Sequence, residues 1–254
     1  MEIVPLGVGE AFAKTLFQTN FLVRPAEGEP FLVDCGHTAS RALHALGLPL
    51  SSIPAVVLSH LHADHIGGLE ELGFMAYFAW HSRPRLHVPS ELLPHLWEHA
   101  LKAGMGQRLA DQAGGSFDAE LETYFEVHPV RAPEPFRLGS VVVTPFPTPH
   151  TPGRASWGFR LDDSATGRAA LLTCDSRLDL GNLERFGPGA ETIFHDCQLT
   201  SNGNHIHATL DELLILPSEY RRRIVLVHYG DDWRAHAHRA APMVFGVEGR
   251  VYTF

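Results

Sequence analysis

The chain has 254 residues, 44% of them hydrophobic, and a formal net charge of −9 at pH 7. Its length allows a full hydrophobic core, and its negative charge argues against extended nucleic acid as a partner, since RNA is bound mainly through cationic contacts to phosphates. No apolar run approaches the ~20 residues of a membrane helix, and the start of the chain lacks a signal-peptide pattern. We therefore expect a cytoplasmic protein with no membrane partner, and the sequence leaves a homodimer open.

The first third of the chain predicts strands joined by one helix. Apolar runs predict strands over residues 3–8, 20–24, 31–35 and 55–59, and a helix is expected over 38–46. The third strand ends in the sequence Asp34-Cys35-Gly36. Its cysteine is one of three in the chain, and the odd number favours reduced thiols over a disulfide framework.

The loop after the fourth strand carries the densest chemistry in the sequence. His60, His62, Asp64 and His65 place four side chains that can bind metal within six positions. Imidazole and carboxylate together suit Zn, Fe or Mn, and one loop can divide such ligands between two ions. The alternative is a solvated histidine-rich loop, since the chain has 17 histidines. The pair Gly67-Gly68 is expected to turn the backbone tightly before a helix over 69–72.

The middle of the chain is less regular. A helix is predicted over 90–103, capped by Ser90 and with a proline inside it. The segment from Gly104 to Glu126 looks like a loop. It has two interpretations, a lid over the site or a plain surface insertion, and the surface insertion is the safer one.

The second half predicts strands over 141–144, 157–161, 169–174, 192–194, 224–228 and 250–254. Three of these runs end in, or are followed by, a polar residue that binds metals well: His150, Asp175 and His228. Taken alone, each residue is more often part of a core or a surface. Their order after the histidine-rich loop favours ligation instead. Because such ligands must meet at one point, we assign residues 1–254 to a single domain.

The pattern His60-x-His62-x-Asp64-His65, followed by a distant His, Asp and His, resembles the signature of the metallo-β-lactamase fold superfamily. The opening segment Leu6 to Phe12 is similar to that of its ribonuclease Z and phosphodiesterase branch. The resemblance implies an α/β fold, a four-layer αββα sandwich. It also implies a site for two divalent ions, Zn first with Mn or Fe as alternatives, held by His60, His62, Asp64, His65, His150, Asp175 and His228.

The same resemblance implies supporting residues. Asp34 and Asp196 would orient ligands, although Asp196 stands where the branch more often has Glu, and the shorter side chain puts its contact to His207 in question. His207 is also placed at the start of an amphipathic helix over 208–216, where a histidine can donate to a phosphate oxygen. His205 is a rival for that role.

The expected chemistry is hydrolysis by a metal-bridging hydroxide, with Asp64 and His207 as catalytic residues. A small phosphodiester, such as a cyclic nucleotide, is the favoured substrate. The interval between His150 and Asp175 is too short for the arm with which ribonuclease Z grips transfer RNA. Alternatives are a glyoxalase II-like thioester or lactone hydrolase, a ribonuclease Z-like RNA endonuclease and a non-enzymatic sensor on the same fold.

Overall fold

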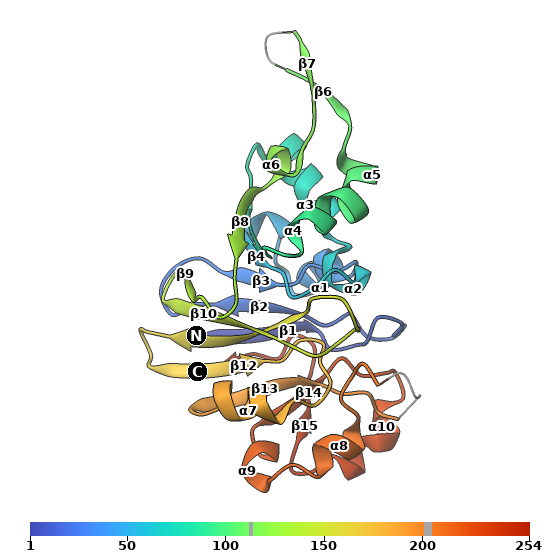
Figure 1. Ribbon diagram of the computed structural model, residues 1–254, viewed down its shortest axis with the longest axis vertical. Helices are drawn as coiled ribbons and strands as arrows, with labels where there is room; N and C mark the ends of the chain where they lie inside the picture. The colour runs from blue at the N-terminus through green and yellow to red at the C-terminus, as the bar shows by residue number, and fades with distance from the viewer. Residues whose placement is uncertain (112–113, 201–204) are drawn as a thin grey trace.

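The computed structural model of the protein describes residues 1–111, 114–200 and 205–254. Two sheets pack face to face, and helices cover their outer faces (Figure 1). Within the described residues each large sheet has seven strands. This arrangement confirms the predicted αββα sandwich. That residues 1–254 form a single domain stays a prediction.

The first sheet has the strand order β16-β1-β2-β3-β4-β5-β8. Its strands are β1 (Glu2–Gly7), β2 (Asn20–Arg24), β3 (Phe31–Val33), β4 (Ala55–Val57), β5 (Arg85–Pro89), β8 (Glu126–Val130) and β16 (Tyr252–Thr253). Strands β3, β4, β5 and β8 run parallel. The carboxyl ends of parallel strands meet at one edge, so the loops after β3 and β4 lie side by side.

The second sheet has the order β15-β14-β13-β12-β11-β10-β9. Its strands are β9 (Phe136–Leu138), β10 (Val141–Pro147), β11 (Trp157–Asp163), β12 (Arg168–Leu172), β13 (Ala190–Asp196), β14 (Ile224–Val227) and β15 (Val244–Phe245). Strands β12 to β15 are parallel, and β9 to β12 are antiparallel. The loops after β12, β13 and β14 therefore share an edge as well.

Alternation along the strands builds two apolar layers. Val33 and Val57 face the second sheet and join the core between the two sheets. Their neighbours Leu32 and Val56 face the other way and pack under the helices that cover the first sheet. Side chains of this kind contribute about 1.5–3 kcal/mol each when fully buried. Side chains alternate between the two faces of a strand, so a shift of one residue in the pairing would turn all of them to the wrong face. The alternation therefore fixes the register of these strands and which face packs against which layer.

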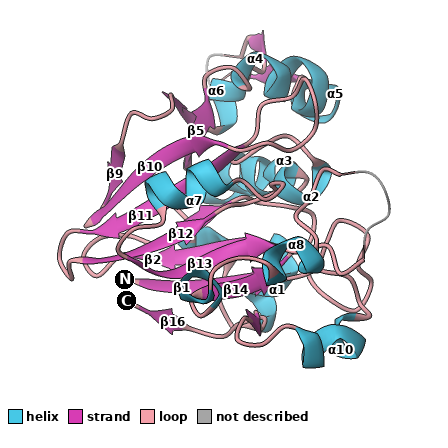
Figure 2. Cartoon of the chain, turned by 60° about the horizontal axis from the view of Figure 1, so that its bottom comes forward, coloured by secondary structure: helices cyan, strands magenta, loops and turns pink. Residues whose placement is uncertain are grey.

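The helices form the two outer layers, and Figure 2 shows α7 and α8 lying across the second sheet. Over and beside the first sheet lie α1 (Ala39–Ala45), η1 (Leu50–Ser52), α2 (Ala63–Ile66), α3 (Leu69–Phe74), η2 (Met75–Trp80), α4 (Leu93–His95), η3 (Leu96–Leu101), α5 (Lys102–Met105) and α6 (Leu121–Tyr124). With the second sheet lie α7 (Leu180–Phe186), α8 (Leu210–Leu214), α9 (Ser218–Arg221), α10 (Trp233–His236) and η4 (Ala237–Arg239). None of the helices in the described ranges is long and apolar enough to cross a membrane.

Several predicted elements differ from the structure. The helix expected over 90–103 is α4, the π-helix η3 and α5 in succession, and the helix expected over 208–216 is limited to α8. The segment from Gly104 to Glu126 contains a hairpin of β6 (Arg108–Ala110) and β7 (Ser116–Asp118), which projects from the top of the molecule in Figure 1. Strands β5 and β8 were not predicted, because each contains a histidine and a proline that interrupt the apolar pattern.

Candidate metal centre

The histidine-rich loop lies where the parallel strands of the first sheet end. Strand β4 stops at Val57, Ser59 and His60 follow at the edge, and α2 begins at Ala63. His60 and His65 are buried together with Asp64, whereas His62 is half-buried. The predicted ligands of the second sheet come from the ends of β10, β12 and β14. The two sheets thus bring all seven predicted ligands to one place, in overlapping groups that could hold metal ions.

The first group consists of His60, His62, His150 and Asp175. The Nε2 atom of His150 lies 3.2 Å from Nδ1 of His62. The Nε2 atoms of His60 and His150 each lie 3.8 Å from Oδ2 of Asp175. All four donor atoms lie within 4.8 Å of one another, which is the spacing of ligands around one ion.

The second group consists of Asp64, His65, Asp175 and His228. His65 Nε2 is 3.3 Å from Asp64 Oδ2 and 3.4 Å from Asp175 Oδ1. His228 Nε2 is 3.3 Å from Asp175 Oδ2 and 3.4 Å from Asp64 Oδ2. Asp175 belongs to both groups, so its carboxylate can bridge two ions.

Buried atoms without hydrogen bonds test whether cations fit these groups. Within the described part of the chain, no hydrogen bond reaches Nε2 of His60, Nε2 of His65 or either carboxylate oxygen of Asp175. All three side chains are buried. Leaving a carboxylate buried without donors is costly, and a divalent ion bound to these atoms would remove that cost. The donor set therefore fits two divalent cations.

Burial and neighbouring charges shift the pKa values of the clustered side chains. Burial, together with the neighbouring His65, holds the pKa of His60 well below its ordinary value, which keeps that imidazole in the neutral form that binds metal. Burial would raise the pKa of Asp175, but His228 and His65 outweigh it and hold that pKa well below the usual range. For His228 burial is again opposed, here mainly by Asp175, and its pKa rises to about 9.

Asp34 binds the histidine-rich loop through hydrogen bonds. Its carboxylate accepts hydrogen bonds from Ser59 N at 2.8 Å, from Ser59 Oγ at 2.7 Å and from Nδ1 of His65 at 2.7 Å. These contacts leave Nε2 of His65 to face the cluster. The loop that contains Gly36 packs closely against the loop that contains Asp64, since a Cβ atom on Gly36 would lie 1.8 Å from the carbonyl oxygen of Asp64. Only glycine allows the two loops to pack in this way.

The predicted turn at Gly67-Gly68 is present, but it does not depend on the backbone freedom of glycine. Both residues have ordinary right-handed helical angles, so no turn there requires glycine. A Cβ atom on Gly68 would instead lie 2.5 Å from the carbonyl oxygen of Gly36. The glycine is needed for close packing and not for backbone freedom. The left-handed angles lie on Asp34, Cys174 and His228, with φ of 66°, 49° and 58°.

His207 contacts Asp196 even though Asp196 is shorter than glutamate. The distance from His207 Nδ1 to Asp196 Oδ2 is 2.7 Å. The neighbours of His207 are fixed as well, since Ile206 O accepts from His150 Nδ1 at 2.9 Å and Ala208 N donates to Ser176 O at 2.9 Å. The His207 ring lies 4.8 Å from the rings of both His150 and His228.

The predicted position of His207 at the start of a helix is wrong. Thr209 caps α8, and its side chain and that of Glu212 form a capping box, so the helix begins at Leu210. His207 lies on the preceding loop, where contacts with Asp196 orient it and the helix dipole does not. The rival His205 is exposed, and it lines neither of the cavities described next.

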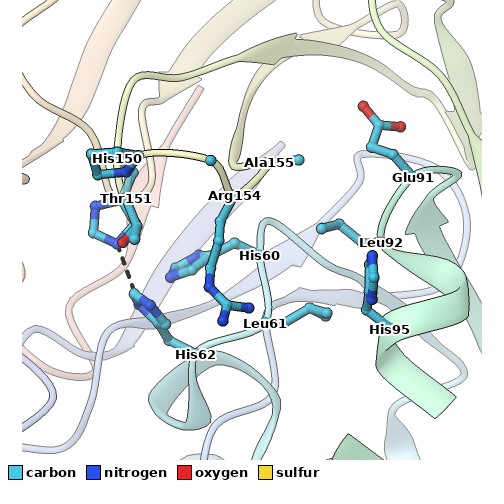
Figure 3. A pocket seen from close by; sticks show the side chains of 12 residues that line it. His60, Leu61, His62, Glu91, Leu92, His95, His150, Thr151, Arg154 and Ala155 are labelled. Carbon is cyan, nitrogen blue, oxygen red and sulfur yellow. Dashed lines mark hydrogen bonds between the residues drawn. The ribbon is translucent and has the colours of Figure 1, made fainter. Parts of the chain in front are cut away.

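Two cavities open on the cluster. One, of about 610 Å³, is lined by His60, His62 and His150 of the first group and by Glu91, His95 and Arg154, which the sequence did not single out. Figure 3 shows the Arg154 side chain extending toward Leu61 and His62. The second, of about 620 Å³, is lined by Asp64, Asp175, His207, His228 and Phe12, among others. None of the described residues between Gly104 and Glu126 lines either cavity, so nothing supports the lid interpretation.

A family model described as Anti-Pycsar protein Apyc1 matches residues 1–252. The chain belongs to the Anti-Pycsar protein Apyc1 family. An Apyc1 protein from Paenibacillus harenae is 38% identical over 233 residues, which covers 91% of this chain and 90% of the relative. An Apyc1 protein from Bacillus phage 010DV004 is 35% identical over 260 residues and covers 99% of this chain and 98% of its own length.

Solved structures with low identity share the fold. A diphosphatase from the PhnP family superposes with a TM-score of 0.77 at 18% identity, over 100% of this chain and 97% of that one. The metallo-β-lactamase fold protein YhfI from Bacillus subtilis gives a TM-score of 0.74 at 18% identity, over 99% and 98% of the two chains. With its His and Asp clusters, this Apyc1 family member is a metal-dependent hydrolase of the phosphodiesterase type.

Proposed function

We propose that the protein hydrolyses a small cyclic nucleotide with the help of two divalent metal ions. The observation that carries the proposal is the shared carboxylate of Asp175, which joins two groups of buried ligands beside His207. Such an arrangement fits two ions on one phosphoryl group. His60, His62 and His150 would hold one ion, Asp64, His65 and His228 the other, and Asp175 both.

The metal ions, when bound, supply Lewis acidity that lowers the pKa of water and polarises a phosphoryl oxygen. The chain supplies the remaining functions. Asp64 would hold its metal and fix the direction of attack, and Asp34 keeps His65 oriented. Water adds to phosphorus and releases a proton to the solvent, one phosphorus–oxygen ester bond breaks, and the departing oxygen takes up a proton.

His207 is the proposed source of that proton. Its Nδ1 faces Asp196, so Nε2 is the nitrogen left to face the cavity. Asp196 would act as the residue that orients the ring, and a positioned donor of this kind is worth roughly a hundredfold in rate or more.

Three observations support a small substrate. The family acts on cyclic nucleotides. The stretch between His150 and Asp175 is filled by β11, β12 and their connections, with no inserted arm. The net charge of −9 disfavours a long polyanion. For the ions, the donor set suits Zn, with Mn or Fe as alternatives. A cytoplasmic location is also proposed, supported by three buried free thiols.

A substrate panel on the metal-loaded protein tests the proposal. It contains 3′,5′- and 2′,3′-cyclic nucleotides of each base, bis-p-nitrophenyl phosphate, a thioester, a lactone and a transfer RNA precursor. We expect turnover of cyclic nucleotides to exceed that of every other substrate, and an Asp175→Ala variant with intact folding to be inactive. Faster turnover of the thioester or lactone would keep the metal site and overturn the substrate class.

A further inference from the structure

We propose that Phe12 is the platform on which the nucleobase of the substrate stacks. The inference rests on the proposed function and names the part of the site that receives the base. Phe12 lies on the loop between β1 and β2, and the residue is 79% exposed. It lines the cavity of about 620 Å³ that opens on the metal centre.

The choice of cavity follows from which ligands each one exposes. The cavity beside Arg154 is lined by the three histidines of the first group, and Asp175, which both groups share, is not among its lining residues. The cavity beside Phe12 is lined by Asp175, by His62 of the first group and by Asp64 and His228 of the second. His207 also lines this second cavity. A phosphoryl group that is to touch both ions and His207 must therefore enter from the Phe12 side.

Hydrogen bonds tie down the loop that carries Phe12 on both sides. The Asp231 carboxylate accepts hydrogen bonds from Lys14 N at 2.8 Å, Thr15 N at 3.0 Å and Thr15 Oγ at 2.7 Å. On the other side of Phe12, Glu10 N donates to Tyr229 O at 3.1 Å. A loop fixed on both sides loses little further freedom when a ligand binds. The backbone on either side of the exposed ring is thus anchored beside the metal centre.

The chemistry of the cavity indicates a base as the partner of this ring. Among the described residues lining this cavity, Phe12 is the one aromatic side chain apart from histidines. Ala11 and Ile206 add apolar surface beside it. In a cyclic nucleotide the base is the one planar, weakly hydrated part. Stacking of a base on an aromatic ring tolerates any base, because every base has a π-face.

Kinetics with and without a base test the inference. Two substrates are compared: a 3′,5′-cyclic nucleotide and the methyl riboside 3′,5′-cyclic phosphate, which has the phosphodiester and the sugar but no base. Phe12→Ala should lower kcat/KM for the cyclic nucleotide by about tenfold or more, mainly through KM, because stacking acts before and during the reaction. It should leave the base-free substrate and the bound metal unchanged. Purine substrates should lose more than pyrimidine substrates.

Three further variants sharpen the test. Phe12→Trp should retain activity on cyclic nucleotides, whereas Phe12→Leu, which is apolar but not aromatic, should not. Ile215→Ala is the matched control, since Ile215 is 81% exposed and lines neither cavity. A readout independent of turnover is the affinity for the nucleoside monophosphate product, measured by calorimetry, which Phe12→Ala should weaken by a similar factor.

Each remaining outcome is decisive. Equal losses on both substrates, or no loss on the cyclic nucleotide, would overturn the stacking role. A base-dependent loss in Arg154→Ala with none in Phe12→Ala would move the base to the other cavity. If the unmodified protein hydrolyses cyclic nucleotides while Phe12→Ala has no effect, the inference alone fails. If the unmodified protein hydrolyses neither phosphodiester, the proposed function fails and the inference fails with it.

Discussion

Single residues in this site have separable tasks. Asp175 belongs to both groups of proposed metal ligands, whereas Asp34 contacts His65 and Asp196 contacts His207. The left-handed angles of Asp34, Cys174 and His228 mark where strands bend sharply into the site. Such angles cost about 1–3 kcal/mol each outside glycine, so the surrounding contacts must hold them. Substitutions can therefore separate binding of metal from chemistry.

Asp34→Asn should weaken metal binding without unfolding the protein. The variant keeps the size of the side chain but loses the charge that accepts from His65 and Ser59. Loss of such a supporting contact typically lowers metal affinity by about 10- to 100-fold. Titration with a competing chelator measures the affinity, and Asp118→Asn on the exposed strand β7 is the control. Unchanged affinity would mean that Asp34 has only a structural role.

His207→Ala should keep both ions, while kcat falls by about a hundredfold, the size of a lost proton donor. Metal analysis and steady-state kinetics on the same preparation separate the two effects. His205→Ala is the matched control, because His205 is exposed and lines neither cavity. Loss of metal together with activity would make His207 a ligand. Normal kinetics would mean that His207 has only a structural role.

At the scale of elements, strand β5 contains a buried histidine that bears on acid stability. His87 is 7% exposed, stacks between His128 and Phe136, and makes no side-chain hydrogen bond within the described residues. Burial, with help from His128 and Arg85, lowers its pKa from 6.5 to about 4. The folded protein therefore resists protonation of a group that the unfolded chain protonates below pH 6.5.

This difference predicts a loss of stability as the pH falls from about 6.5 to about 4, with little effect above that range. The contribution approaches about 3 kcal/mol at the acid end. His87→Leu has no titrating group, so its free energy of unfolding should fall less over this range. Denaturant unfolding of both proteins at pH 7 and pH 4.5 measures the difference. Equal losses in the two proteins would show that His87 contributes nothing.

The sequence predicts secondary-structure elements well where the apolar residues follow one clear pattern. The runs before His60, Asp175 and His228 are buried strands, and each ends within three residues of that polar side chain, so their ends were visible. Strand β5 was not visible, since His87 looks polar although it is buried. The Phe12 and Arg154 cavities could not be predicted either, because they depend on how distant loops face one another.

At the scale of the whole molecule, the proposed metal ligands come from both sheets. His60 and His65 follow β4 of the first sheet, whereas Asp175 and His228 follow β12 and β14 of the second. Separating the sheets would therefore separate the ligands. Metal binding should favour the packed arrangement over any state in which the sheets have come apart.

Removal of metal should consequently lower the melting temperature. An ion at a thousand times its Kd contributes about 4 kcal/mol, which corresponds to a shift of about 10 °C for a protein of this size. Thermal melts with and without a chelator measure the shift. The melt of Asp175→Ala should respond much less to the chelator. A shift of the same size in that variant would place the stabilising ion elsewhere.

The two cavities also matter for the design of inhibitors. They meet at His62, which lines both, and they enclose similar volumes of about 610 and 620 Å³. A compound with a metal-chelating centre could carry one substituent toward Arg154 and another toward Phe12. The first arm would occupy space that no bridging phosphoryl group needs, and the second would compete with the base. Selectivity against other chelator-sensitive enzymes would then come from the arms, while the shared metal chemistry supplied only the anchor.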